Sequence, residues 1–162
     1  MEIALTGLQK SNRLARSAAL AIATFAGAVL LGPGAGAQNV SAVGMWKTID
    51  DETKQPKALV RISEQGGVLS GRIEKLFNPS RPNPVCDRCT DDRKDKPIEG
   101  MTILAGLRPA GDGWADGEIL DPNNGKVYRA KARLVEGGNQ LEVRGFVGVT
   151  LFGRTQTWHR EP

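Results

Sequence analysis

Apolar and polar residues alternate with a period of two along much of the chain after residue 42. The clearest case is residues 126–135, whose apolar positions are Tyr128, Ala130, Ala132 and Leu134 and whose intervening positions carry Arg129, Lys131 and Arg133. A period of two is typical of a β-strand with one buried and one solvated face. Segments that read as strands also lie at 43–49, 58–63, 68–74, 101–107, 114–121, 141–146 and 154–160. The pattern therefore predicts roughly eight strands.

Glycine pairs between these segments predict which strands form hairpins. A turn at residues 66–67 sets Val60 opposite Ile73. The same register brings Arg61 opposite Arg72, which is unfavourable unless both side chains extend into water.

A second glycine pair, at residues 137–138, gives a hairpin in which both faces agree. It sets Leu134 against Leu141 on the apolar face and Arg133 against Glu142 on the polar face. A wrong register would rarely satisfy both faces at once.

The dipeptide at residues 124–125, Asn-Gly, predicts a third hairpin. If it forms a two-residue primed turn, Asp121 lies opposite Tyr128 and Ile119 lies opposite Ala130. Asp121 and Tyr128 would then both point inward near the mouth of a barrel.

The strand count and the lack of a long amphipathic helix after residue 37 predict the fold class. A sheet of roughly eight strands has few helices here to cover its edges, so closing on itself removes both edges. We expect an all-β fold, a single antiparallel β-barrel over residues 38–162, in which the first and last segments pair.

Residues 1–37 have the layout of a secretory signal peptide. Basic residues at positions 10, 13 and 16 precede an apolar and small-residue run over 17–32, and an A-x-A cleavage motif follows at 35–37. The apolar run is shorter than the roughly 20 residues that span a bilayer. We therefore expect cleavage, no membrane span after it, and a periplasmic or secreted protein.

Charge excludes one class of partner. The whole chain has 22 Lys and Arg and 18 Asp and Glu, of which the expected leader removes three basic residues and one acid. The remainder has 19 basic and 17 acidic residues, interspersed along the chain. Because no cationic cluster is interleaved with aromatic residues, we expect no nucleic-acid partner.

The first strand begins with a Gly44-x-Trp46 motif that resembles the start of lipocalin and other calycin barrels. In such barrels the tryptophan closes one end beneath a basic side chain from near the C-terminus. The resemblance implies that Arg160 or Arg154 stacks on Trp46 here, with a cation–π gain of about 0.5–2 kcal/mol.

A closer likeness covers nearly all of residues 38–162. It rests on ordered blocks at 44–46, 71–73, 86–89, 100–104, 121–128, 141–146 and 152–158. In order and spacing these blocks resemble the family of exported bacterial proteins catalogued as domain of unknown function 2147. The resemblance implies an exported, lipocalin-like β-barrel and no particular reaction.

The only cysteines, Cys86 and Cys89, form a C-x-x-C pair in a proline-rich, charged segment. In an oxidising compartment we expect a disulfide that holds the excursion over residues 77–97 compact. A redox-active pair is the alternative, but the helix that lowers a thiol pKa in such enzymes is not predicted here. Metal binding is less favoured, because the one histidine, His159, is predicted to lie in the last strand, away from the cysteines. The nearby aspartates at 87, 91, 92 and 95 could add oxygen ligands, but such loops are more often simply solvated.

No catalytic constellation is recognised, so we predict no enzyme, no cofactor and no metal site. The lone histidine, His159, is interpreted as an outward strand residue, and no serine lies in a strand–elbow–helix context. The best candidates for lining a ligand site are Trp114, Asp121, Tyr128 and Trp158.

The sequence favours an exported β-barrel that binds a small apolar or amphipathic ligand, or an envelope protein partner. The alternatives are a thiol–disulfide redox protein using Cys86 and Cys89, or a packed structural or adaptor module without a ligand. The apolar stretch 147–153 could dock a partner, although burial as a closing strand or a cap over one end is the simpler expectation.

Overall fold

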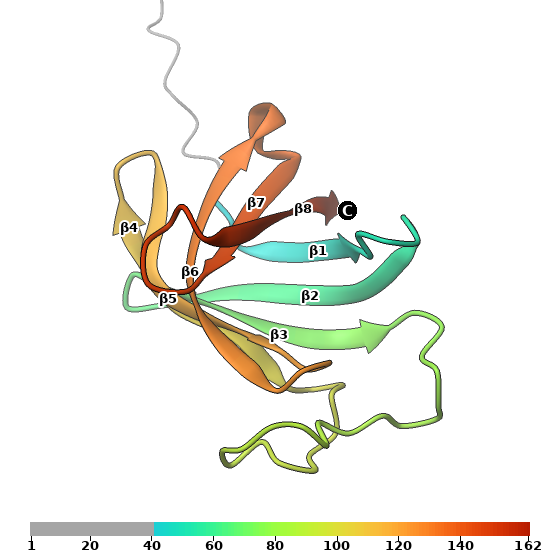
Figure 1. Ribbon diagram of the computed structural model, residues 1–162. Helices are drawn as coiled ribbons and strands as arrows, with labels where there is room; N and C mark the ends of the chain where they lie inside the picture. Colours follow the sequence, from blue (N-terminus) through green and yellow to red (C-terminus); the bar gives the residue numbers. More distant parts are fainter. Residues whose placement is uncertain (1–40) are drawn as a thin grey trace, which may run out of the picture. The chain divides into compact units, whose positions relative to one another are not determined.

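A computed structural model describes residues 41–162, so the predicted signal peptide, residues 1–37, lies outside the described residues. The described part forms β1 (Gly44–Ile49), β2 (Pro56–Gln65), β3 (Val68–Leu76), β4 (Thr102–Ala110), β5 (Gly113–Asp121), β6 (Lys126–Val135), the short 3-10 helix η1 (Glu136–Gly138), β7 (Gln140–Phe146) and β8 (Gly153–Glu161) (Figure 1).

Each strand pairs with the next in antiparallel fashion, and β8 returns to pair with β1. The closing contact is short and joins Met45 to Glu161, Trp46 to Arg160 and Lys47 to His159. The predicted all-β, closed antiparallel barrel is therefore confirmed, with eight strands.

Two of the three predicted hairpin registers are confirmed. In β2–β3, Val60 lies opposite Ile73 and Arg61 opposite Arg72; the like-charge conflict is relieved because Arg61 Nε donates to Glu74 Oε1 at 3.2 Å. In β6–β7, Leu134 lies opposite Leu141 and Arg133 opposite Glu142. The Arg133 Nε to Glu142 Oε2 distance is 2.7 Å.

The predicted β5–β6 register is wrong by two residues. Asp121 lies opposite Lys126, and Ile119 lies opposite Tyr128. Four residues, 122–125, make the connection because the Asp121 carbonyl oxygen accepts the Gly125 N–H at 2.8 Å. The Asp121 carboxylate also accepts the Asn123 N–H at 3.0 Å, so the aspartate itself builds the turn.

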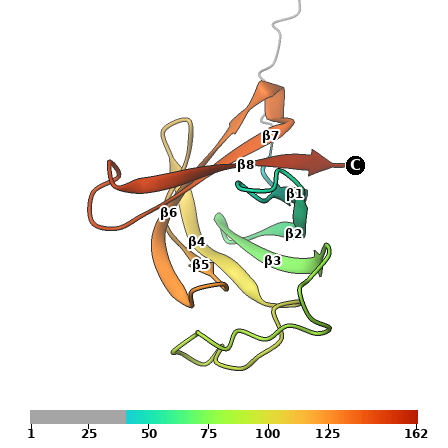
Figure 2. The same cartoon turned by 45° about the vertical axis from the view of Figure 1, so that its right-hand side comes forward.

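The up-and-down order defines two ends of the barrel (Figure 2). We call one the closed end: it holds residues 41–43, the start of β1, the end of β8 and the hairpin turns at 66–67, 111–112 and 136–139. We call the other the loop end: it holds the connections 50–55, 77–101, 122–125 and 147–152.

Candidate functional site

Trp46 seals the closed end. Its side chain is fully buried, and its indole Nε1 donates to the Ala42 carbonyl oxygen at 2.8 Å. The Arg160 guanidinium carbon lies 4.3 Å from the centroid of the Trp46 ring, a cation–π contact. Gly44 precedes it with a φ of +139°, and a Cβ there would come within 3.1 Å of Arg160 Nη1. Glycine is therefore the residue that lets the arginine approach.

Arg160 also ties three chain segments together. Its guanidinium donates to the carbonyl oxygens of Ser41 at 2.7 Å, Val43 at 3.1 Å and Gly138 at 2.7 Å. Arg154, the other arginine considered for this role, lies on β8 towards the loop end and pairs there with Asp51. The position over Trp46 therefore belongs to Arg160.

Large apolar side chains pack inside the barrel. Trp46, Trp158, Leu69, Leu104, Leu107 and Leu141 are among the largest fully buried side chains. Small inward residues leave no space, because their neighbours occupy it: a Cβ at Gly117 would come within 2.7 Å of Leu107, and one at Gly145 within 3.2 Å of Ile119. The glycines permit close packing of these neighbours and do not open a lumen at their positions.

A disulfide joins Cys86 and Cys89, which are 0% and 2% exposed and belong to the apolar cluster of the core. Hydrogen bonds wrap the segment around it: Cys86 N–H donates to the Lys96 carbonyl oxygen at 2.9 Å, and the Cys86 carbonyl oxygen accepts from Asp95 N–H at 3.0 Å. A partner in thiol–disulfide exchange must reach a sulfur atom. Neither cysteine presents an accessible surface, and no helix begins beside them.

The disulfide segment packs on the β5–β6 connection. A Cβ at Gly125 would come within 1.9 Å of the Arg88 carbonyl oxygen, and Cys86 Sγ lies 3.8 Å from the Pro122 carbonyl oxygen. The predicted role as a staple for a long connection has this contact as its physical basis, since the segment is held against the barrel.

The four predicted ligand-lining residues lie in three places. Asn124 Nδ2 donates to Asp121 Oδ2 at 3.0 Å and to the Tyr128 hydroxyl at 3.1 Å, so Asp121 and Tyr128 share one polar cluster at the loop end. Trp158 is 1% exposed in the core, with its Nε1 3.4 Å from Gln156 Oε1. Trp114 pairs with Ala132 near the closed end of β5.

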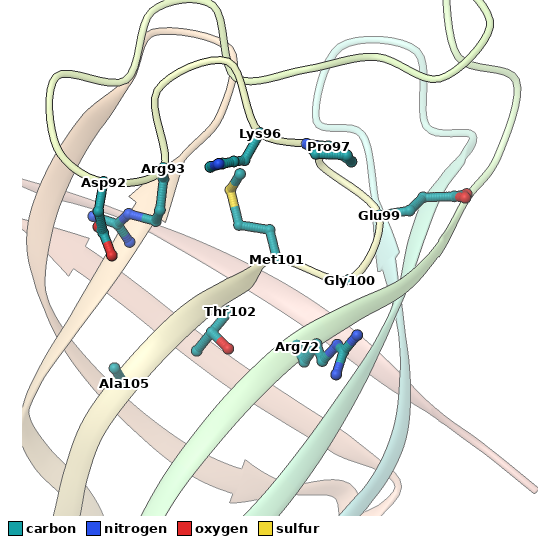
Figure 3. A pocket seen from close by; sticks show the side chains of 10 residues that line it. All are labelled: Arg72, Asp92, Arg93, Lys96, Pro97, Glu99, Gly100, Met101, Thr102 and Ala105. Atoms are coloured by element: carbon teal, nitrogen blue, oxygen red, sulfur yellow. The ribbon is translucent and has the colours of Figure 1, made fainter.

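Two grooves were not foreseen from the sequence, and both involve outward-facing residues. We call the larger, of about 580 Å³, the β3–β4 groove; its lining includes Arg72, Arg93, Lys96, Glu99, Met101 and Thr102 (Figure 3). The smaller, of about 490 Å³, includes Trp114, Lys131, Arg133 and Arg144. Lys131 and Arg133 are exposed and alternate with buried Ala130 and Ala132, so this groove lies on the outer face of the barrel.

Charge in the β3–β4 groove is only partly neutralised. Arg93 forms a forked pair with Asp91, and this hydrogen bonding lowers the pKa of Asp91 to about 2 and raises the pKa of Arg93. The Glu99 carboxylate accepts the Leu76 N–H at 2.7 Å. Within the described residues, Arg72 and Lys96 form no ion pair, so two cations border the groove without a carboxylate partner. Figure 3 shows them on opposite sides of Met101.

The β7–β8 connection, residues 147–152, is neither a closing strand nor a buried cap, so the simpler expectation for it is wrong. Its large apolar side chains are Val147 (64% exposed), Val149 (61%), Leu151 (79%) and Phe152 (70%). Only Val43 and Val127 are also large, apolar and exposed among the described residues.

Over residues 41–162 we find no group of three or more histidine, cysteine, aspartate or glutamate side chains placed to hold a metal ion. The same residues contain no helix with the length and apolar character needed to cross a bilayer.

A closed eight-stranded barrel with Gly44-x-Trp46 beneath a C-terminal arginine defines the lipocalin-like class. In agreement, the Helicobacter pylori protein HP1028, described as belonging to the lipocalin family, superposes with a TM-score of 0.66 at 18% identity, covering 76% of this chain and 84% of that one. Residues 44–160 match the family described as "Uncharacterized protein conserved in bacteria (DUF2147)", and the chain belongs to that family. No curated protein matches the sequence.

Proposed function

We propose that this protein is an exported, lipocalin-like binding module that acts through the outer surface of its loop end. Export is supported by the signal-like layout of residues 1–37 and gives a periplasmic or secreted location. One observation carries the binding role: large apolar side chains pack inside the barrel, whereas four of the six large apolar side chains that are exposed within residues 41–162 lie in residues 147–152.

The contrast between inside and outside favours a surface site over a ligand enclosed in the barrel. A lumen would need space at the small inward positions, and Leu107 and Ile119 fill the space beside Gly117 and Gly145. Contiguous exposed apolar surface on a folded domain often marks a site of interaction. The 147–152 connection is such a surface.

Site-specific photocrosslinking in cells tests this function. A photoreactive residue replaces Leu151 in the full chain, and the matched control replaces Gln65, which is exposed in the hairpin at the closed end. We expect an adduct, to protein or lipid, from position 151 and none from position 65. Equal labelling of the two positions, or none at either, would rule the proposal out.

Export is tested separately by fractionation and mass measurement. The expected product is the chain cut after Ala37 and recovered outside the cytoplasm. A full-length chain retained in the cytoplasm would contradict this part of the proposal without bearing on the binding surface.

A small amphipathic ligand is a second candidate, and the β3–β4 groove favours it. Arg72 and Lys96 supply positive charge, while Met101 supplies apolar surface, a combination that suits an amphipathic anion. Native mass spectrometry of the protein recovered from cells should then show a bound mass, and Arg72→Ser with Lys96→Ser should remove it. Retention of the same mass by the double variant would exclude the groove as its site.

A further inference from the structure

The 147–152 connection projects outward from the barrel, beyond β6 in the view of Figure 2. Its apolar side chains are carried at four of six successive positions, with Gly148 and Thr150 between them. The connection therefore presents a protruding apolar tip of one short segment. We call residues 147–152 the apolar tip.

Arg144 on β7 holds the apolar tip in its shape. Its Nε and Nη2 donate to the Thr150 carbonyl oxygen at 2.9 and 2.6 Å, and Nη2 donates to the Leu151 carbonyl oxygen at 3.2 Å. Nη1 donates to Thr155 Oγ1 at 3.0 Å, which anchors the same guanidinium to β8. Three of these contacts fix the tip's backbone, and the fourth fixes the position of the guanidinium itself.

The apolar tip also satisfies further backbone groups internally. Val147 N–H donates to the Phe152 carbonyl oxygen at 3.1 Å, and Phe152 N–H donates to the Val149 carbonyl oxygen at 3.1 Å. The carbonyl oxygens of residues 149–152 therefore all have a protein donor. The N–H groups of residues 148–151 have no acceptor among the described residues. Because an unpaired backbone group costs several kcal/mol in hydrocarbon, an interfacial position, where water still reaches these groups, suits the tip better than the bilayer core.

Cationic side chains flank the apolar tip on the outer face of β6 and β7. Arg129 lies opposite Phe146, with its guanidinium carbon 5.5 Å from the Phe146 ring centroid, and Lys131 lies opposite Arg144. None of Arg129, Lys131 and Arg144 forms an ion pair with a described residue.

Acidic side chains on this face are fewer. Glu118 lies opposite Arg129 on β5, and Glu142 is already paired with Arg133. Asp112 lines the groove with Arg133 and Glu142 towards the closed end. Next to the apolar tip, Arg129, Lys131 and Arg144 outnumber Glu118, and this local excess of positive charge complements an anionic surface.

We propose that the apolar tip inserts into the interface of an anionic lipid bilayer, with Arg129 and Lys131 facing the headgroups. This rests on the proposed function and names the partner of the same surface. Exposed aliphatic and aromatic side chains beside cations are the combination that binds such interfaces, through buried apolar area and attraction to anionic lipid. A bilayer is favoured over a protein partner because the apolar tip protrudes and because the cationic side chains beside it complement an anionic surface.

Vesicle flotation tests the proposal on the exported protein purified from cells that express the full chain. We expect binding to phosphatidylcholine vesicles that contain phosphatidylglycerol, weaker binding without it, and further weakening as salt rises. Leu151→Ser with Phe152→Ser should reduce the binding constant by about tenfold or more. The matched control, Val43→Ser, removes an exposed valine at the closed end and should bind as the wild type does.

The positive charge is tested by Arg129→Ser with Lys131→Ser. This variant should lose binding to anionic vesicles while keeping whatever weak binding the wild type shows to phosphatidylcholine alone. If both double variants bind anionic vesicles as tightly as the wild type, the bilayer proposal is overturned.

A local probe separates insertion from simple adsorption. Phe152→Trp places an indole in the apolar tip, and brominated lipid should quench the added fluorescence on vesicle binding. Binding with no quenching of that indole would overturn insertion by this segment, even if another part of the protein held the vesicle.

The outcomes distinguish failure of this inference from failure of the proposed function. If position 151 crosslinks to a protein and vesicles are not bound, the bilayer proposal is overturned and the proposed function stands. If position 151 gives no adduct and vesicles are not bound, both are overturned.

Discussion

The two ends of the barrel use an arginine for opposite purposes. At the closed end, Arg160 donates to three carbonyl oxygens and covers the buried ring of Trp46. At the loop end, Arg144 donates to the carbonyl oxygens of Thr150 and Leu151 in a segment whose apolar side chains remain exposed. The Arg160 guanidinium covers an apolar ring and excludes water from it. The Arg144 guanidinium instead fixes a segment whose apolar side chains remain exposed to water.

The closed end therefore contributes mainly to the stability of the fold, whereas the loop end is available for interaction. Burial of an aromatic ring and satisfaction of carbonyls at the closed end both favour the folded state. The exposed apolar side chains at the loop end contribute little to the stability of the fold, so folding does not require apolar residues there. Substitutions at the two ends should therefore have effects of different size and kind.

Removing the ring that seals the closed end should have the largest effect. Trp46→Ala deletes a fully buried aromatic side chain and leaves Arg160 without the surface that it covers. We expect a loss of about 3–5 kcal/mol in the free energy of unfolding, measured by urea denaturation. A loss of less than about 1 kcal/mol would show that the closed end is not where the fold is held.

Removing the cation above that ring should cost less. Arg160→Met keeps apolar contact with Trp46 but leaves the carbonyl oxygens of Ser41, Val43 and Gly138 without this donor. We expect a loss of about 2–3 kcal/mol by the same measurement. Arg154→Met is the matched control, because Arg154 is exposed and pairs only with Asp51 at the other end; its effect should be smaller by more than half.

Removing the disulfide should have an intermediate effect. Cys86→Ala with Cys89→Ala opens a short loop, for which chain entropy predicts a loss of about 2 kcal/mol. Because both cysteines are buried, the native wild-type protein should also resist reduction by glutathione until it is unfolded. Rapid reduction of the folded protein, followed by thiol labelling and mass measurement, would contradict the staple and favour a redox role.

Low pH should remove a smaller contribution to the stability of the fold, the one made by the Asp50 carboxylate at the loop end. Hydrogen bonds from the Thr53 and Glu52 N–H groups, the Thr53 hydroxyl and Lys57 lower the pKa of Asp50 from 3.8 to about 2. A depressed folded-state pKa means that the contribution is complete above the unfolded pKa and is lost as pH falls through about 2.

Asp50→Asn isolates that contribution. The variant should melt below the wild type near neutral pH, and the gap should narrow as the pH falls below 3.8 towards 2. Thermal melts followed by circular dichroism across this range provide the measurement. A gap that stays constant with pH would mean that the carboxylate's charge is not what stabilises the turn.

The smallest effect on folding should come from the apolar tip itself. Leu151→Ser with Phe152→Ser replaces two side chains that are 79% and 70% exposed, so the free energy of unfolding should change by no more than about 0.5 kcal/mol per site. A large loss in urea denaturation would show that the tip packs on the barrel in solution, which would end the contrast between the two ends.

Most of the strand pattern could be predicted because it depends on neighbouring residues. Alternation in residues 126–135 and glycine pairs at 66–67 and 137–138 give the β2–β3 and β6–β7 registers directly. The β5–β6 register was wrong because Asp121 completes a four-residue turn with its own carbonyl and carboxylate. A rule based on the Asn-Gly dipeptide alone does not include hydrogen bonds from a preceding aspartate, which here favour the longer turn.

The grooves and the exposure of the apolar tip could not be predicted in the same way. Arg72 lies on β3 and Lys96 lies near the end of the disulfide excursion, and only the folded path of that excursion places both side chains on one groove. The tip reads as a core strand because its composition is apolar. The feature that holds the tip in its exposed position is the hydrogen bonding of Arg144 to the Thr150 and Leu151 carbonyl oxygens. The sequence does not show this contact, which exists only in the folded chain.

The seam between β1 and β8 has a consequence for when the barrel can close. Trp46 and Arg160, which covers it, are separated by more than one hundred residues of sequence, so the arginine is synthesised well after the tryptophan. At about 5–20 residues per second, the wait between them is on the order of ten seconds. Until β8 has been synthesised, the sheet has two unpaired edges and the barrel cannot close, so Trp46 gains its cover only after all eight strands are available.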